Sequence, residues 1–119
     1  MTVPAVPKGT GRAGRELWRS VMGSFVLDDH ERTLLEQAVA VADTCADLQA
    51  VVDRDGPLVR GPDGMDRAHA ALVELRQQRI LLARLIVALR IPLGDEEQEG
   101  RTPRRALRGV YGIRSGGAA

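Results

Sequence analysis

The 119 residues of this chain suffice for one small domain, and a net charge of +1 excludes a chain that is basic throughout. Aromatic residues make up 3% of the sequence and hydrophobic residues 44%, so a core must be built from leucine, valine and alanine. The single cysteine, Cys45, excludes an internal disulfide, and no stretch has the roughly 18 apolar residues of a membrane span. We expect a cytoplasmic protein with no membrane partner.

Residues 1–11 contain two prolines and two glycines, a composition that predicts a flexible arm. Residues 12–22 predict a short helix that Gly23 ends. Trp18 is expected to anchor this helix on the long helical hairpin, and the alternative is a stacking or interface role. One edge of this helix carries three arginines at positions i, i+3 and i+7, namely Arg12, Arg15 and Arg19.

A long helix is predicted from Asp28 to about Asp55. Asp28 and Glu31 have the spacing of a capping box, and Gly56 followed by a proline ends the helix. Its apolar residues recur in steps of four and three, which places them on one stripe. The stripe consists of Leu34, Ala38, Val41, Cys45, Leu48 and Val52. Cys45 is accordingly expected to act as a small buried apolar residue.

A connector over residues 57–65 leads into a second long helix. Its Pro62-Asp63-Gly64 turn signature is compatible with a small β-hairpin and with an open loop. Asp66 is the predicted N-cap of the second helix, which runs from about Arg67 to residue 89 or 90. Its stripe consists of Ala68, Leu72, Leu75, Leu82, Ile86 and Leu89, with Arg79 standing where one more apolar residue would fall.

These elements predict an all-α fold in which the two long helices form an antiparallel hairpin, because two such stripes bury best against each other. The short N-terminal helix belongs to the same helical domain, residues 12–93, and a flexible tail follows over residues 94–119. A second apolar edge on the later helix predicts a self-association surface. This edge consists of Leu81, Leu85 and Ala88.

The tail begins with an acidic patch over residues 95–99 and continues with arginines that have no acidic residue among them. The planar guanidinium group suits phosphate because it donates two parallel hydrogen bonds. One interpretation is a DNA-binding surface, and the other is a solvated tail neutralised by its own acidic patch. The DNA-binding candidates are Lys8, Arg12, Arg15, Arg19, Arg101, Arg104, Arg105, Arg108 and Arg114.

Catalytic and metal-binding patterns are missing from the sequence. The two histidines, His30 and His69, are each expected near the start of a helix, and no Cys, His and Asp residues have the spacing of metal ligands. Asp28 and Asp29 are explained by helix capping. We therefore expect a protein that is not an enzyme and that uses neither a metal nor a cofactor.

The order of the features adds a family resemblance. Residues 11–18 read Gly-Arg-Ala-Gly-Arg-Glu-Leu-Trp, and Leu27, Asp28, Glu31 and Leu35 lead into an alanine-rich helix. The order continues with Gly56-Pro57 and with the turn over residues 61–64. It ends with His69, followed by Leu72, Glu74 and Arg76, and with a final Leu89-Arg90-Ile91-Pro92. This order, over residues 4–92, resembles the small terminase subunits of tailed phages, in the P27 family that includes the HK97-type packaging proteins. Ala70 stands where that family is expected to have a proline, and Leu89-Arg90-Ile91 replaces a leucine-glycine-leucine end.

The resemblance implies a DNA-packaging component without enzymatic activity in the host cell cytoplasm. Such a subunit assembles into a homo-oligomeric ring, engages phage DNA and regulates the large terminase subunit. The tail arginines are candidates for contacting either the DNA or the large subunit. The alternative from the residues alone is a helical interaction module, a dimeric adaptor or regulator that closes into a four-helix bundle without binding DNA.

Overall fold

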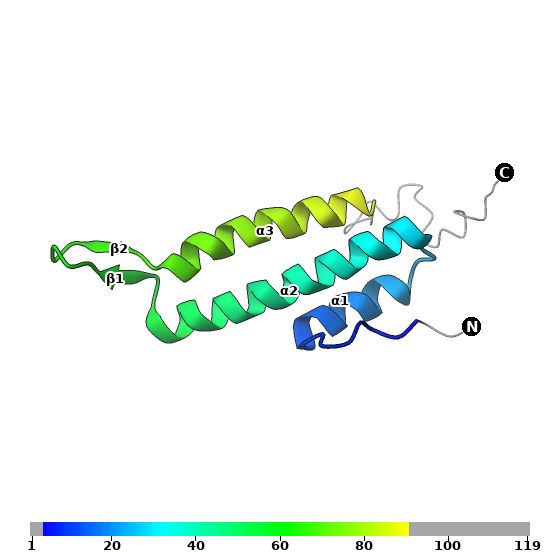
Figure 1. Cartoon of the computed structure of the whole chain (residues 1–119), viewed down its shortest axis with the longest axis horizontal. Coiled ribbons are helices and arrows are strands. Elements are labelled where there is room, and N and C mark those ends of the chain that lie inside the picture. The colour runs from blue at the N-terminus through cyan, green and yellow to red at the C-terminus, as the bar shows by residue number, and fades with distance from the viewer. Residues whose placement is uncertain (1–3, 91–119) are drawn as a thin grey trace.

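The computed structural model describes residues 4–90 and shows a mostly helical protein (Figure 1). The two long helices form the predicted antiparallel hairpin, and a short helix lies on the opposite side of the central one. A small two-stranded sheet connects the long helices, so the fold is mostly helical and the expected all-α class holds only in part. The elements are α1 (Arg12–Met22), α2 (Asp29–Asp55), β1 (Leu58–Arg60), β2 (Asp66–Ala68) and α3 (Ala70–Ala88).

Helix α2 begins and ends where the sequence predicts. The Glu31 amide donates to Asp28 Oδ1 at 3.2 Å, and the Asp28 amide donates to Glu31 Oε1 at 3.0 Å, which completes the capping box. At the other end Gly56 has φ of 86°, a conformation that favours glycine. These signals are local in sequence, which explains why both ends could be predicted.

Two different faces of α2 are buried. The predicted stripe contributes the buried Ala38, Val41 and Val52. A second face, which the stripe did not include, contributes Leu35 and Val39, with exposed fractions of 0% and 2%. The second face is buried because α1 covers it.

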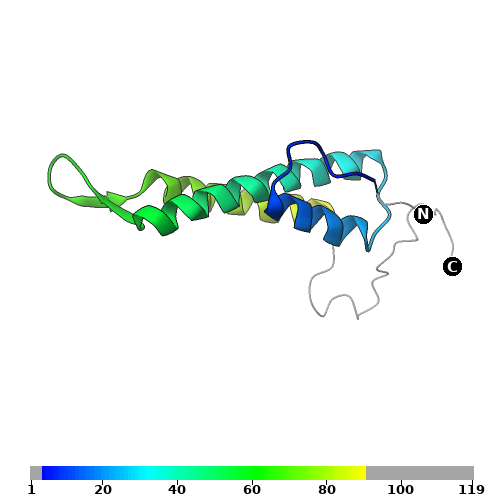
Figure 2. The ribbon, with the colours of Figure 1, turned by 90° about the horizontal axis from the view of Figure 1, so that it is seen from below.

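One cluster joins all three helices. Trp18 and Val21 of α1 pack with Leu35 and Val39 of α2, and with Leu89 at the end of α3. Trp18 is therefore the anchor that the sequence predicts, and its indole Nε1 donates to the Pro4 carbonyl at 2.9 Å. Because the cluster lies at one end of the hairpin, α1 covers only the first part of α2 (Figures 1 and 2).

Residues 4–11 lie against the helices, where the sequence predicts a mobile arm. Besides the bond from Trp18 to Pro4, Val6 packs against the core cluster. The Thr10 hydroxyl donates to the Pro7 carbonyl at 2.6 Å, which closes a turn within the segment. The contacts of Pro4 and Val6 come from residues distant in sequence, so the proline and glycine content of the segment does not predict them.

The connector forms a β-hairpin in which β1 and β2 pair antiparallel, with Val59 opposite Arg67. All six strand residues are exposed, and the hairpin projects beyond the ends of α2 and α3 (Figure 2). The predicted N-cap, Asp66, is wrong, because this residue lies in β2 with its carboxylate 3.8 Å from Arg60. His69 caps α3 instead, and Ala68 lies in β2 rather than on the helical stripe.

Among residues 4–90, no helix combines the length and the apolar character needed to cross a membrane.

Candidate nucleic-acid and self-association surfaces

The three arginines of α1 lie on the side of the helix that faces away from α2. Gly14, Trp18 and Val21 are the buried residues of α1, and the arginines occupy the opposite edge, where all are exposed. We call Arg12, Arg15 and Arg19 the arginine edge. The predicted spacing therefore produces one cationic edge.

Two of these arginines make local contacts that leave them accessible. Arg12 Nε lies 3.5 Å from Glu16, in an ion pair whose arginine side chain is 87% exposed. Arg15 Nη1 donates to the Thr10 carbonyl at 2.7 Å, which joins the arginine edge to residues 4–11. An exposed ion pair of this kind contributes about 0–1 kcal/mol, so phosphate can replace Glu16 at small cost.

The charge of the described residues is balanced overall. Residues 4–90 contain twelve basic and twelve acidic side chains, and the excess positive charge of the chain falls in residues 91–119. Arg101, Arg104, Arg105, Arg108 and Arg114 lie outside the described residues. Positive charge in the described part is therefore local, at the arginine edge and on α3.

Asp43 of α2 holds the start of α1. Its carboxylate accepts from the Gly11 amide and from the Gly14 amide, each at 2.7 Å. The N-cap residue, Gly11, has no side chain to cap its own helix, so Asp43 supplies the acceptor and the negative charge that a helix N-terminus favours. The role of Asp43 was not predicted from the sequence, where the available signal was the pair of glycines, Gly11 and Gly14, three residues apart.

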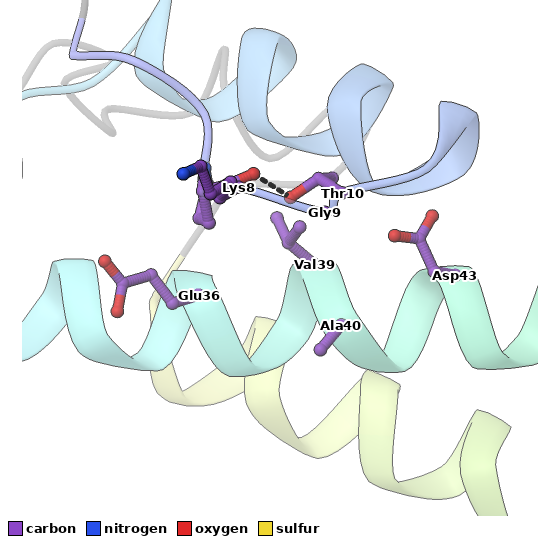
Figure 3. A pocket seen from close by; sticks show the side chains of 8 residues that line it. Lys8, Gly9, Thr10, Glu36, Val39, Ala40 and Asp43 are labelled. Atoms are coloured by element: carbon purple, nitrogen blue, oxygen red, sulfur yellow. Dashed lines mark hydrogen bonds between the residues drawn. The ribbon is translucent and has the colours of Figure 1, made fainter.

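A hollow of about 280 Å³ lies between residues 7–10 and α2 (Figure 3). Val39 and Ala40 form its apolar part, and Glu36 and Asp43 give it two carboxylates. The DNA-binding candidate Lys8 lines the same hollow, whereas the three residues of the arginine edge do not. The hollow is open, so it is a surface feature that a protruding side chain could fill.

The helix α3 is apolar on both sides. Leu75 and Ala71 are buried toward α2, yet large apolar side chains also cover the opposite side. Of the predicted edge, Leu81 is 42% exposed, Leu85 is partly buried and Ala88 is exposed. The structure adds Val73, Ile80 and Val87, which are 47%, 49% and 70% exposed. Large apolar side chains on the outer side of a helix are normally covered by another element, and none of the described elements covers these.

Polar contacts hold the junction between the β-hairpin and the two long helices. His69 Nδ1 accepts from the Ala71 amide at 2.9 Å, and Nε2 lies 2.9 Å from Asp55 Oδ2. Arg54 donates two hydrogen bonds to the same carboxylate, at 2.7 and 3.0 Å. The bonds from Arg54, followed by the bond with His69, hold the pKa of the Asp55 carboxyl well below its ordinary value of 3.8.

His30 and two carboxylates come together at the start of α2. The possible ligand atoms of Asp28, His30 and Glu31 lie within 4.8 Å of one another, which the sequence spacing did not suggest. His30 Nδ1 is 3.1 Å from Asp28 Oδ1, and the two carboxylates serve the capping box. Helix capping therefore explains this exposed group.

Arg79 and Cys45 belong to the contact between α2 and α3. Arg79 Nη2 donates to Gln49 Oε1 at 2.6 Å, so this arginine bridges the helices at the position where the stripe lacks an apolar residue. Cys45 is partly buried; burial raises the pKa of its thiol, and the charge of Arg79 lowers it to a smaller extent. Cys45 is accordingly a partly buried packing residue.

No protein-family model, curated protein or solved structure matches this chain.

Proposed function

We propose that this protein is a small terminase subunit of a tailed phage or prophage. In this function it binds viral DNA, assembles into a homo-oligomeric ring and regulates the large terminase subunit during packaging. The observation that carries the DNA-binding part is the exposed arginine edge of α1, on a body whose described residues, counted with that edge, are balanced in charge. The order of residues from Gly11 to Pro92 supports the family assignment.

The arginine edge suits a phosphate backbone more than a base-reading role. Its side chains are long, exposed and anchored on a helix that Asp43 and Trp18 fix in place. A ring repeats the edge in every subunit, so weak phosphate contacts add up to a useful avidity. DNA recognition by such an array would depend on the number of contacts and on DNA shape.

The test is the salt dependence of binding to duplex DNA. For the unaltered chain the logarithm of the affinity should fall with the logarithm of salt concentration, at a slope of about −0.9 per phosphate contact. Replacing Arg12, Arg15 and Arg19 with glutamine should flatten that slope. Arg60→Gln with Arg67→Gln is the matched control, because the hairpin arginines pair with Asp66 and Asp63. Binding that does not change from low to high salt would contradict the proposal.

A second set of variants separates the arginine edge from the tail. Replacing Arg101, Arg104, Arg105 and Arg108 with glutamine removes the tail candidates and leaves α1 unchanged. If only this set flattens the slope, the tail contacts the DNA. If this set leaves the slope intact but abolishes capture of the large terminase subunit, the tail is the docking segment.

The alternative function is a helical interaction module that binds protein and not DNA. The equal numbers of basic and acidic side chains in residues 4–90 favour it, as does the apolar outer side of α3. If this alternative is correct, the protein does not bind DNA even at low salt. The alternative also requires a dimer with two-fold symmetry that closes into a four-helix bundle.

A further inference from the structure

The side of α3 that faces away from α2 is an apolar surface of one helix's length. We call Val73, Ile80, Leu81 and Val87 the outer face of α3, and Arg84 lies among them, one turn from Ile80 and from Val87. Each of the four apolar side chains is between 42% and 70% exposed. Exposed large apolar side chains that gather on one side of a helix, here with Arg76, Gln77 and Arg84 between them, often mark a contact with another protein.

The central helix has a different free surface. Between the side covered by α1 and the side covered by α3, α2 exposes small and acidic residues at helical spacing. We call Glu36, Ala40, Thr44 and Asp47 the outer face of α2, and all four are exposed. Ala40 and Thr44 let a neighbouring helix approach closely, and the hollow beside residues 7–10 opens next to Glu36 and Ala40 (Figure 3).

The charges of the two helices are opposite. Helix α3 carries Arg76, Arg79 and Arg84 against the single acid Glu74. Helix α2 carries seven acidic residues against two arginines. A contact between the α3 helices of two copies would bring arginines together, whereas a contact between α3 and α2 brings arginines to carboxylates.

We propose that the outer face of α3 in one copy docks on the outer face of α2 in the next copy. Large apolar side chains of α3 then cover Ala40 and Thr44, and Arg84 meets the carboxylate of Asp47. Since the two faces are different, the contact is heterologous and repeats from copy to copy until a ring closes. This inference deepens the assembly step of the proposed function and rests on it for the closure of the ring.

Two single-face variants test the contact. Ile80→Glu with Val87→Glu disables the α3 face, and Ala40→Arg with Asp47→Arg disables the α2 face; all four positions are exposed. Each variant alone should be monomeric by light scattering on a sizing column. A one-to-one mixture should form a heterodimer of twice the protomer mass, because one intact face remains on each partner.

The outcomes that overturn the proposal are equally specific. If the α2-face variant alone still forms a dimer, or if the mixture stays monomeric, the contact is not between α3 and α2. An unaltered chain that is monomeric at all accessible concentrations would also overturn it. Helical circular dichroism and Trp18 fluorescence check folding, and Val87→Gln replaces the double glutamate variant if that one unfolds.

A charge exchange gives a second, independent measurement. Arg84→Glu and Asp47→Arg should each weaken association by about tenfold or more, and one chain that carries both changes should recover most of the loss. No recovery would contradict the pairing of these faces. DNA binding is measured separately, through the dependence of affinity on salt concentration. Assembly without DNA binding would contradict the proposed function but would still support the contact between α3 and α2.

Discussion

The carboxylate of Asp43 accepts a hydrogen bond of 2.7 Å from the backbone amide of Gly14, across the contact between α2 and α1. The two residues are 29 positions apart, and their contact fixes the helix that carries the arginine edge. Glycine is required there because the helices approach closely. A Cβ on Gly14 would lie 2.6 Å from Thr10 Cγ2 and 2.8 Å from Val39 Cγ1.

We expect Gly14→Ala to destabilise the protein, although Gly→Ala in a helix normally stabilises by about 0.5–1 kcal/mol. The added methyl group forces α1 away from Val39 and Asp43, at a cost of about 1–3 kcal/mol. Denaturant unfolding measures the change, and Ser20→Ala on the exposed side of α1 is the control. A rise in stability for Gly14→Ala would show that the helices have room to separate.

We expect Asp43→Asn to loosen α1 while the helical hairpin stays folded. The amide keeps one acceptor oxygen but loses the charge that favours a helix N-terminus, a change of about 1–2 kcal/mol. Trp18 fluorescence should shift to longer wavelength at lower denaturant than in the unaltered chain. Asp47→Asn is the control, because Asp47 is exposed and lies one turn further along α2. Measured at a protein concentration low enough to keep the copies apart, it should leave the denaturant midpoint of the Trp18 fluorescence change unaltered.

We expect His69→Ala to destabilise the start of α3. The imidazole accepts from the Ala71 amide as an N-cap, and loss of such a cap costs about 0.5–2 kcal/mol. His30→Ala is the matched control, because its side chain is 80% exposed. His69→Asn should recover part of the stability, since asparagine is a good N-cap. Equal losses for the two alanine variants would show that the cap contributes nothing.

We expect Asp55 to make stability depend on acid pH. Arg54 and His69 lower the pKa of this carboxyl in the folded state, so the unfolded chain binds the proton more tightly. The contribution is fully present above the ordinary pKa of 3.8 and is lost as pH falls from there toward the folded pKa. The stability difference between the unaltered chain and Asp55→Asn should therefore shrink below about pH 3.8. A difference that is constant from neutral to acid pH would contradict this linkage.

The sequence by itself determined the elements that depend on neighbouring residues. The bounds of α1 and α2 follow from Gly23, from the capping box of Asp28 and Glu31, and from Gly56. The spacing of apolar residues determined that α2 and α3 pair through one stripe each. The i, i+3 and i+7 spacing of Arg12, Arg15 and Arg19 determined that these arginines lie on one edge of α1. All of these signals span at most a few helical turns.

Only the tertiary structure decided which residues meet from distant parts of the chain. Asp66 and His69 both have the chemistry of an N-cap, and pairing of β1 with β2 took Asp66 into a strand and left the cap to His69. Leu35 and Val39 became core residues because α1 packs on a second face of α2. Asp43 gained its role in the same way, since the amides that its carboxylate accepts from lie at the start of another helix.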